Sequence, residues 1–229
     1  MTDTRTIVSL NGEWDLAFDE KNVGKAQEWF AQFPRKSAKM QVPGVWELIR
    51  PGYDGVGWYR RTFDAPAEWK ARCVRLKIGA AAYFAEVWLN GKYLGKHEGG
   101  YSPFEFEIAR RLRAGTSEVV VRIINPPRGR ELEGFRAGSP LQQSDLPYGK
   151  GAWYYNFGGI WQDVELIVND PVYVKDIYVQ PHPFQKKAVL SVTVRNTGEP
   201  RSVRLVCEAA SRGAEGAPAA AKTVRGRLA

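Results

Sequence analysis

The chain has 229 residues, of which 44% are hydrophobic, so it can bury one sizeable core and a smaller second one. Its formal net charge of +8 comes from 33 Lys and Arg dispersed among 25 Asp and Glu, which indicates a solvated surface with at most a weak affinity for polyanions. No apolar run approaches the roughly 20 residues of a membrane helix, and the first ten residues lack the apolar stretch of a secretory signal. We therefore expect a folded protein that binds neither nucleic acid nor membrane and lies in the cytoplasm, unless a leader has been removed.

Short strand-like runs separated by turn residues fill most of the chain. Apolar and polar residues alternate most clearly at 74–78 and 119–123. The one convincing helical window, residues 24–33, is short and is followed by Pro34, so we expect it at most to decorate the sheets. The pattern predicts an all-β protein of sandwich type. The strand-like runs are, in chain order, 7–18, 55–63, 73–79, 85–91, 92–98, 104–108, 118–125, 159–168, 172–180, 188–196 and 202–209.

Residues 88–108, WLNGKYLGKHEGGYSPFEFEI, combine several turn signals in one short stretch. Asn90-Gly91 supplies the two positive-φ positions of a type I′ turn, so the runs on either side should pair as a hairpin. Gly99-Gly100 permits a sharp bend, and Pro103 prevents the ladder from simply continuing. We therefore expect the chain to leave one sheet at this bend, so that residues 104–108 join another.

A shift in composition divides the chain near residue 170. The turn at 169–171 ends one set of strands, and aromatic residues become scarce after Phe184. We assign residues 1–170 to a first domain, whose length is typical of a jelly roll. Residues 171–229 then form an incomplete immunoglobulin-like β-sandwich, since a full one has about 100 residues.

The second domain lacks enough strands to cover its own apolar faces. The runs at 188–196 and 202–209 need two sheets, and unpaired strand edges invite association with another chain, so we expect self-association through this domain. Beyond Cys207, glycine, proline and small residues interrupt any regular element and offer little to bury. We expect the chain from about residue 211 onward to be mobile, or ordered only by a neighbouring molecule.

Cysteine and histidine are too few to build a metal centre or a histidine-based catalytic triad. Cys73 and Cys207 lie far apart, each within a strand-like run, and are interpreted as buried thiols. The only histidines, His97 and His182, lie in different predicted domains. We therefore expect no metal and no cofactor, and a structural, hydrogen-bonded role for His97.

The stretch VWLNGKYLGKHEGGYSPFEFEI closely resembles the signature of the amino-terminal sugar-binding domain of glycoside hydrolase family 2, which includes β-galactosidases, β-glucuronidases and β-mannosidases. Five other stretches fit the same domain in the same order: SLNGEWDLAF, VPGVWE, GVGWYRRTF, VVVRIIN and GGIWQDVEL. The resemblance covers about residues 7–180. It implies a jelly roll followed by the start of an immunoglobulin-like domain, and a parent enzyme that cleaves O-glycosidic bonds with retention of anomeric configuration.

The catalytic groups that the resemblance implies are not expected in this chain. A retaining glycosidase needs two carboxyl groups about 5 Å apart, and in this family both are carried on a later (β/α)8 barrel of about 250 residues, for which the predicted strands leave no room. The segment RNTGEP resembles the Asn-Glu-Pro of the family's acid/base motif, but Thr197 and Gly198 intervene, so Glu199 is interpreted as part of a turn. Glu105 and Glu107 share one strand face and are interpreted as surface charges. Carbohydrate would therefore reach this chain through the barrel.

A loop rich in glycine and aromatic residues is the candidate sugar contact. Sugars expose apolar C–H faces that stack on aromatic rings, while amides fix their hydroxyl groups. An equally supported alternative is that the same rings pack against the barrel. In several relatives the corresponding loop places an aspartate in the active-site mouth, and counting back from Gly159-Ile160 this chain has a tryptophan there, which argues against galactosidase or glucuronidase specificity. The candidate residues are Trp153, Tyr154, Tyr155 and Asn156.

Five further tryptophans lie within strand motifs, and we expect them to belong mostly to the core. The leading hypothesis is a non-catalytic sugar-binding and scaffold region of a retaining family 2 glycoside hydrolase. The alternatives are an autonomous carbohydrate-binding module and a purely structural interaction domain. The five tryptophans are Trp14, Trp46, Trp58, Trp88 and Trp161.

Overall fold

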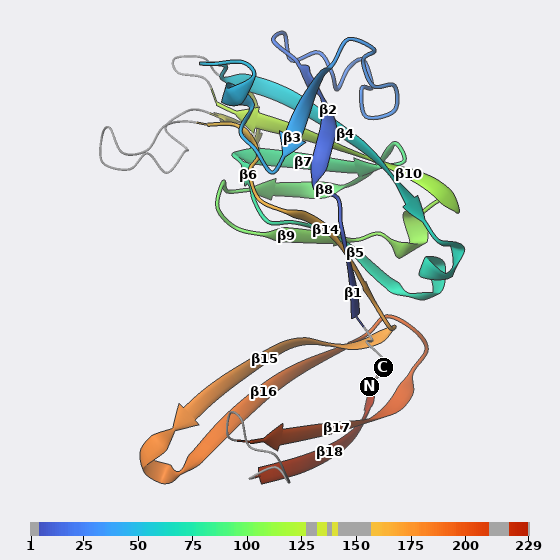
Figure 1. Ribbon diagram of the computed structural model, residues 1–229, viewed down its shortest axis with the longest axis vertical. Helices are drawn as coiled ribbons and strands as arrows, with labels where there is room; N and C mark the ends of the chain where they lie inside the picture. The colour runs from blue at the N-terminus through green and yellow to red at the C-terminus, as the bar shows by residue number, and fades with distance from the viewer. Residues whose placement is uncertain (1–4, 127–131, 137–138, 142–156, 211–219, 229) are drawn as a thin grey trace. The chain divides into compact units, whose positions relative to one another are not determined.

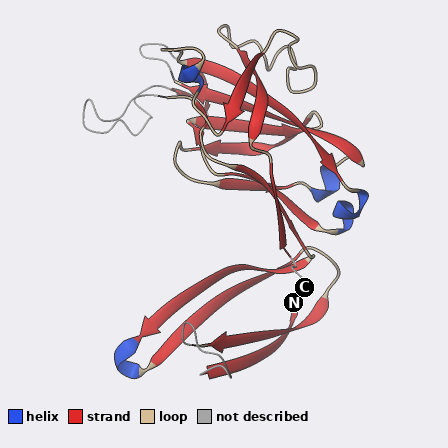
Figure 2. Cartoon of the chain, in the orientation of Figure 1, coloured by secondary structure: helices blue, strands red, loops and turns tan. Residues whose placement is uncertain are grey.

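A computed structural model of the chain describes residues 5–126, 132–136, 139–141, 157–210 and 220–228 (Figure 1). The chain divides into two compact units, Met1–Val168 and Asn169–Ala229. Strands dominate both units, as Figure 2 shows, and the only helices of the described part are short 3-10 turns. These turns are η1 Trp46–Leu48, η2 Ala67–Ala71, η3 Ala109–Arg111 and η6 Pro183–Gln185.

The first unit is a sandwich of two sheets (Figure 1). One sheet has six strands in the order β3-β2-β4-β10-β7-β8, and the other has four in the order β1-β14-β5-β9. Two short pairs, β6 with β13 and β11 with β12, accompany them. The strands are β1 Arg5–Ser9, β2 Gly12–Phe18, β3 Ala38–Val42, β4 Gly55–Ala65, β5 Cys73–Ile78, β6 Ala81–Ala82, β7 Phe84–Leu89, β8 Lys92–Glu98, β9 Phe104–Glu107, β10 Gly115–Asn125, β11 Leu132–Arg136, β12 Ser139–Leu141, β13 Gly159–Ile160 and β14 Val164–Asn169.

The main core lies between the two sheets and follows the predicted alternation. In β5, Val74, Leu76 and Ile78 are fully buried, whereas Arg75 and Lys77 between them lie on the opposite, partly exposed face. Each apolar side chain buried in this way stabilises the fold by about 1.5–3 kcal/mol relative to an exposed one. The same core includes Trp14, Leu16, Trp46, Tyr59, Val121 and Ile123.

A second apolar cluster covers the outer face of the six-stranded sheet. Trp88 stacks on Phe30 and on Trp58, with ring centroids 5.4 and 5.3 Å apart. Phe30 belongs to the segment 24–33, for which the helix prediction is wrong: the segment forms successive turns, and Glu28 has a φ of 52°, which a right-handed helix cannot contain. Burial of its aromatic side chains on the sheet outweighs the local helical preference.

The hairpin and the bend predicted from residues 88–108 are confirmed. Asn90 and Gly91 have φ values of 51° and 75° and connect β7 to β8, with Leu89 paired to Lys92. The amide oxygen of Asn90 also accepts a hydrogen bond from the Glu118 amide at 2.9 Å, so the turn is tied to β10. After Gly99, whose φ is 125°, the chain leaves the six-stranded sheet, and β9 pairs with β5 in the other sheet (Figure 1).

The second unit consists of two antiparallel pairs, in keeping with part of an immunoglobulin-like sandwich. Strand β15 (Val172–His182) pairs with β16 (Lys187–Asn196), and β17 (Arg201–Ala209) pairs with β18 (Ala220–Leu228). Strand β18 contradicts the expectation that no regular element follows Cys207. Its backbone completes a ladder of nine residue pairs with β17, and such a ladder needs no large side chains.

The remaining sequence expectations concern thiols and the turn near Glu199. Cys73 is fully buried, but Cys207 is only partly so, and neither forms a disulfide. Asn196 accepts a hydrogen bond from the Gly198 amide and donates one to the Glu199 carbonyl, which confirms the turn. Within the described ranges, no cluster of three or more metal-binding side chains is present, and none of the helices has the length and apolar character of a membrane span.

Candidate functional site

The four residues predicted to contact sugar, Trp153, Tyr154, Tyr155 and Asn156, lie outside the described residues. The described chain resumes at Phe157, directly after them. The candidate site is therefore built from the segment 157–164, which we call the stem, and from the parts of the sandwich that the stem touches.

Backbone hydrogen bonds join the stem to the segment that follows β3. The Gly44 amide donates to the Ile160 carbonyl at 2.8 Å, and the Trp46 amide donates to the Gly158 carbonyl at 2.9 Å. On its other side, β13 pairs with β6, so Gly159 lies opposite Ala82. The stem is thus held between two segments that lie far from it in the sequence.

Two glycines make this close approach possible. A Cβ atom on Gly158 would overlap the indole ring of Trp46. Gly159 has a φ of 124°, and a Cβ atom there would lie 2.8 Å from the Tyr59 hydroxyl and 2.9 Å from the Gly44 carbonyl oxygen. Any larger residue at either position would push the stem away from the core.

Glu47 adds a side-chain anchor to the stem. Its Oε1 accepts a hydrogen bond from the Gly158 amide at 2.9 Å. Its Oε2 is buried and has no hydrogen-bond partner among the described residues. Burial raises the pKa of Glu47, and the negative charge of Asp54 adds to this effect. An acceptor at position 47 therefore holds the backbone where the predicted sugar-contacting residues end.

Three aromatic rings meet beside the stem, and we call Tyr101, Phe157 and Trp161 the aromatic cluster. The ring centroids lie 5.6 Å apart for Tyr101 and Trp161, 5.7 Å for Phe157 and Trp161, and 6.2 Å for Tyr101 and Phe157, all with edge-to-face geometry. The Trp161 indole N–H donates to the Gly100 carbonyl at 2.7 Å. The bend after β8 is thereby fastened to the stem, while 54% of Tyr101 stays exposed.

Side-chain contacts also link residues at the end of β8 and in the bend to their neighbours. The Tyr83 hydroxyl donates to Glu98 at 3.0 Å. His97 Nε2 lies 3.1 Å from the Ser102 hydroxyl, and its ring stacks on Phe104 with centroids 4.3 Å apart. Burial lowers the pKa of His97, so the ring is neutral at neutral pH. The hydrogen-bonded, structural role expected for His97 agrees with these contacts.

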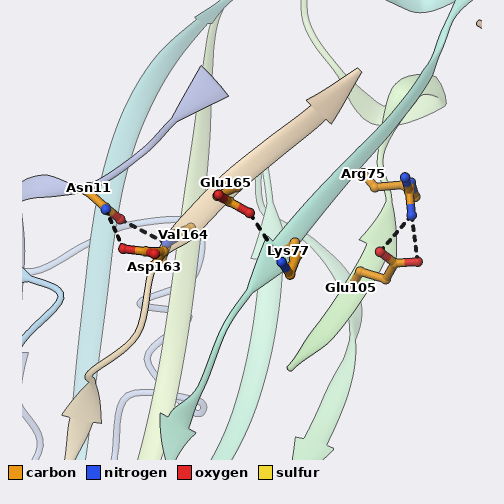
Figure 3. Close-up of polar contacts among 7 residues, drawn as sticks. All are labelled: Asn11, Arg75, Lys77, Glu105, Asp163, Val164 and Glu165. Atoms are coloured by element: carbon orange, nitrogen blue, oxygen red, sulfur yellow. Dashed lines mark hydrogen bonds and ion pairs between the residues drawn. The ribbon is translucent and has the colours of Figure 1, made fainter. Parts of the chain in front are cut away.

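The far end of the stem is fixed by Asn11, as Figure 3 shows. The Asn11 side chain donates to Asp163 at 2.8 Å and accepts from the Val164 amide at 2.9 Å, where β14 begins. Ion pairs continue across the same sheet between Lys77 and Glu165 and between Arg75 and Glu105, as drawn in Figure 3. Glu105 is thus a surface charge, in agreement with its interpretation from the sequence.

Sequence reasoning missed the aromatic cluster. Trp161 was expected in the core with the other four tryptophans, which are indeed at most 5% exposed, but it is only partly buried. The only sequence signal was the Gly99-Gly100 bend, which turns Tyr101 outward. No local sequence pattern predicted that Tyr101 and Trp161 would be in contact.

Comparison with known proteins places this geometry in a family. Residues 48–170 match the model of the glycosyl hydrolases family 2 sugar binding domain, and these residues include the bend, the whole stem and Glu98. The chain belongs to glycosyl hydrolase family 2. The resemblance inferred from the sequence motifs is therefore confirmed.

The chain is similar in sequence and structure to named β-glucuronidases and β-galactosidases. The chain is 28% identical to a β-glucuronidase of Paenibacillus borealis over 198 residues, which cover 78% of this chain and 32% of the relative. It is 29% identical to a β-galactosidase of Thermoanaerobacter pseudethanolicus, covering 83% and 23%. Among solved structures, a β-glucuronidase of Ruminococcus gnavus superposes with a TM-score of 0.75 at 27% identity and covers all of this chain and 39% of that one. The chain thus spans about a third or less of the length of the first two relatives.

Proposed function

We propose that this chain is the non-catalytic sugar-binding and scaffold region of a retaining family 2 glycoside hydrolase, and that it holds one wall of the substrate pocket. The anchored stem carries this proposal. It is fixed to the core by Gly44, Trp46 and Glu47 at the point where the predicted sugar-contacting residues end. A segment fixed in this way can position side chains against a substrate at low entropic cost.

Hydrolysis is assigned to a (β/α)8 barrel outside this chain. The matched family description is that of a sugar-binding domain, and the named relatives are β-glucuronidases and β-galactosidases about three or more times as long as the matched segment. A retaining mechanism needs an acid/base and a nucleophile held about 5 Å apart across the sugar. We propose that this chain supplies contacts to the sugar and the barrel supplies both carboxyl groups.

Turnover by the complete enzyme tests the proposal through Trp153. We expect Trp153→Ala to reduce kcat/KM by about fivefold, since an aromatic contact at a pocket mouth contributes on the order of 1 kcal/mol. The melting temperature should stay within about 1 °C, because the glycine content of the loop predicts a surface excursion whose truncation removes little core area. The 229-residue chain alone should not hydrolyse aryl glycosides. Unchanged turnover in the variant, or clear turnover by the isolated chain, would contradict the proposal.

We also propose that the second unit can associate with a second copy. Its β15–β16 pair exposes a row of apolar side chains on one face, formed by Ile177, Val179 and Leu190, each at least 44% exposed. The cross-strand pair of Val179 and Leu190 lies at its centre. Covering this face by a copy would remove apolar area from water.

A further inference from the structure

The aromatic cluster exposes a large ring that the anchoring of the stem does not require. The hydrogen bonds described for the stem link it to the segment 44–47, to β6, to the Gly100 carbonyl and to Asn11, and none of them involves the Tyr101 side chain. Tyr101 is nevertheless 54% exposed and rests on the edges of two partly buried rings. Aromatic side chains line most small-molecule sites, so an exposed ring in a fixed position can serve as one wall of such a site.

Two segments hold the aromatic cluster in place: the stem, which carries Trp161, and the bend, which carries Tyr101. Trp161 is fixed by the hydrogen bond from its indole N–H to Gly100 and by its place in the stem. Gly100 itself is buried, and a Cβ atom there would lie 3.5 Å from Ala82 Cβ, so the bend lies directly on the sheet. Because Tyr101 follows this buried residue, a ligand that stacks on its ring would not have to order the backbone first.

The size and polarity of the cluster fit a sugar ring better than a protein surface. A stable protein interface buries about 800 Å² on each partner, far more than three side chains with one exposed ring can supply. A pyranose presents one apolar C–H face, which matches one aromatic face, and hydroxyl groups at its rim. Ser102 follows Tyr101 in the sequence and carries a hydroxyl, which also contacts His97 Nε2 at 3.1 Å.

The charges around the cluster favour a neutral sugar. No arginine or lysine of the described chain stacks on these three rings, since the described cation–π contacts involve other aromatics. Glu98 lies three residues before Tyr101, and the neighbouring His97 is neutral. A carboxylate on the sugar would find no described cation stacked on these rings, and Glu98, three residues before Tyr101, carries a charge of the same sign.

We propose that the aromatic cluster is a carbohydrate subsite that stacks one neutral hexopyranose on the exposed face of Tyr101. This inference rests on the proposed sugar-binding function and adds to it the residues and the charge class of the ligand. Phe157 and Trp161 support the Tyr101 ring from below, and Gly99-Gly100 holds the bend that presents it.

Saturation-transfer NMR on the whole 229-residue protein tests the subsite, with methyl β-galactopyranoside and methyl β-glucuronide as probes. We expect transfer to the ring C–H protons of the galactoside, and a weaker signal for the glucuronide. Tyr101→Ala should lower the galactoside signal about fivefold, whereas Tyr101→Phe should retain it because the aromatic face remains. Tyr178→Ala is the matched control, because Tyr178 is similarly exposed at 62% but belongs to the other unit.

Folding is checked separately by the melting temperature and the circular dichroism of each variant. Because Tyr101 is mostly exposed, its replacement should leave both unchanged. Trp161→Phe gives a second line of evidence: it keeps a ring but loses the hydrogen bond to Gly100, and it should lower the signal less than Tyr101→Ala does.

Three results would overturn the subsite. The first is an equal galactoside signal in wild type and Tyr101→Ala, and the second is no signal in the wild type. The third concerns the complete enzyme. If Tyr101→Ala lowers its melting temperature while the saturation-transfer signal of the galactoside is unchanged, the cluster docks another domain instead. The Trp153 turnover experiment is independent of all three, so the subsite can fail while the proposed function stands.

Discussion

Glu47 and His97 are the two titratable residues of the candidate site whose surroundings shift their pKa in opposite senses. Burial raises the pKa of Glu47, whose carboxylate accepts a hydrogen bond from the Gly158 amide. Burial lowers the pKa of His97, whose ring lies between Ser102 and Phe104. Both residues therefore make stability depend on pH, and the two effects can be separated by substitution.

Glu47→Gln and Glu47→Ala separate the hydrogen bond from the charge. Glutamine keeps an acceptor for the Gly158 amide, whereas alanine leaves that amide without one, and we expect the alanine variant to lose about 1–2 kcal/mol in the free energy of unfolding. Because the folded-state pKa is raised from 4.5, the favourable contribution of protonated Glu47 is lost as pH rises through the raised pKa. Wild type should therefore lose stability relative to Glu47→Gln as pH rises above 4.5.

Urea unfolding at several pH values measures this difference. A glutamine variant that is as unstable as the alanine variant at pH 7 would show that the charge, and not the acceptor, anchors the stem.

His97→Gln tests the histidine. The folded-state pKa of His97 lies below its ordinary value of 6.5, so the unfolded chain binds more protons as pH falls through this range, and acid destabilises the fold. We expect the melting temperature of wild type to fall between pH 7.5 and 5.5 by more than that of His97→Gln. Glutamine can still bond to Ser102 but does not titrate. If the melting temperatures of wild type and His97→Gln fell equally over this pH range, the titration of His97 would not contribute to the acid sensitivity.

At the scale of elements, the outer face of the six-stranded sheet is apolar and is partly covered by another segment of the chain. Strand β10 is buried on both faces: Val121 points to the core between the sheets, and Val120 belongs to the outer cluster. The turns at 24–33 provide part of this cover with Trp29, Phe30 and Phe33. These turns therefore act as a structural layer although they contain no regular helix.

Trp88 is the central test of that layer, because it stacks on both Phe30 and Trp58 and is 5% exposed. We expect Trp88→Ala to lower the free energy of unfolding by about 3–5 kcal/mol, through lost apolar burial and the cavity that remains. Chemical unfolding followed by circular dichroism measures this loss. Tyr101→Ala is the control, and it should change stability by less than about 0.5 kcal/mol. Equal losses in the two variants would remove the distinction between a core aromatic and an exposed one.

At the scale of the whole molecule, the second unit leaves apolar surface in water. Sedimentation at increasing protein concentration should detect association of copies, because Ile177, Val179 and Leu190 form an exposed row. We expect Val179→Lys to shift the protein toward the monomer, since a charge in this row opposes burial. Ser191→Lys, on the opposite face of β16, should not. A protein that stays monomeric at every concentration, or a dimer that Val179→Lys leaves intact, would exclude this face as the contact.

The sequence by itself determined the features that depend on neighbouring residues and on family motifs. Asn90-Gly91 fixed the hairpin, because only such residues adopt two successive positive φ values readily. Alternation in β5 fixed which side chains enter the core, because successive side chains of a strand point to opposite faces. The ordered motifs indicated the sugar-binding domain of family 2, which the match over residues 48–170 confirms.

The tertiary structure alone decided which distant segments meet. Glu47 reaches the Gly158 amide across 111 residues of sequence, and Trp161 reaches Gly100 across 61. It also decided that residues 24–33 form turns and that β18 exists, both against local preference. The physical reason is that burial and strand pairing are set by the whole sheet, whereas local propensities differ by only about 1 kcal/mol per residue and yield to them.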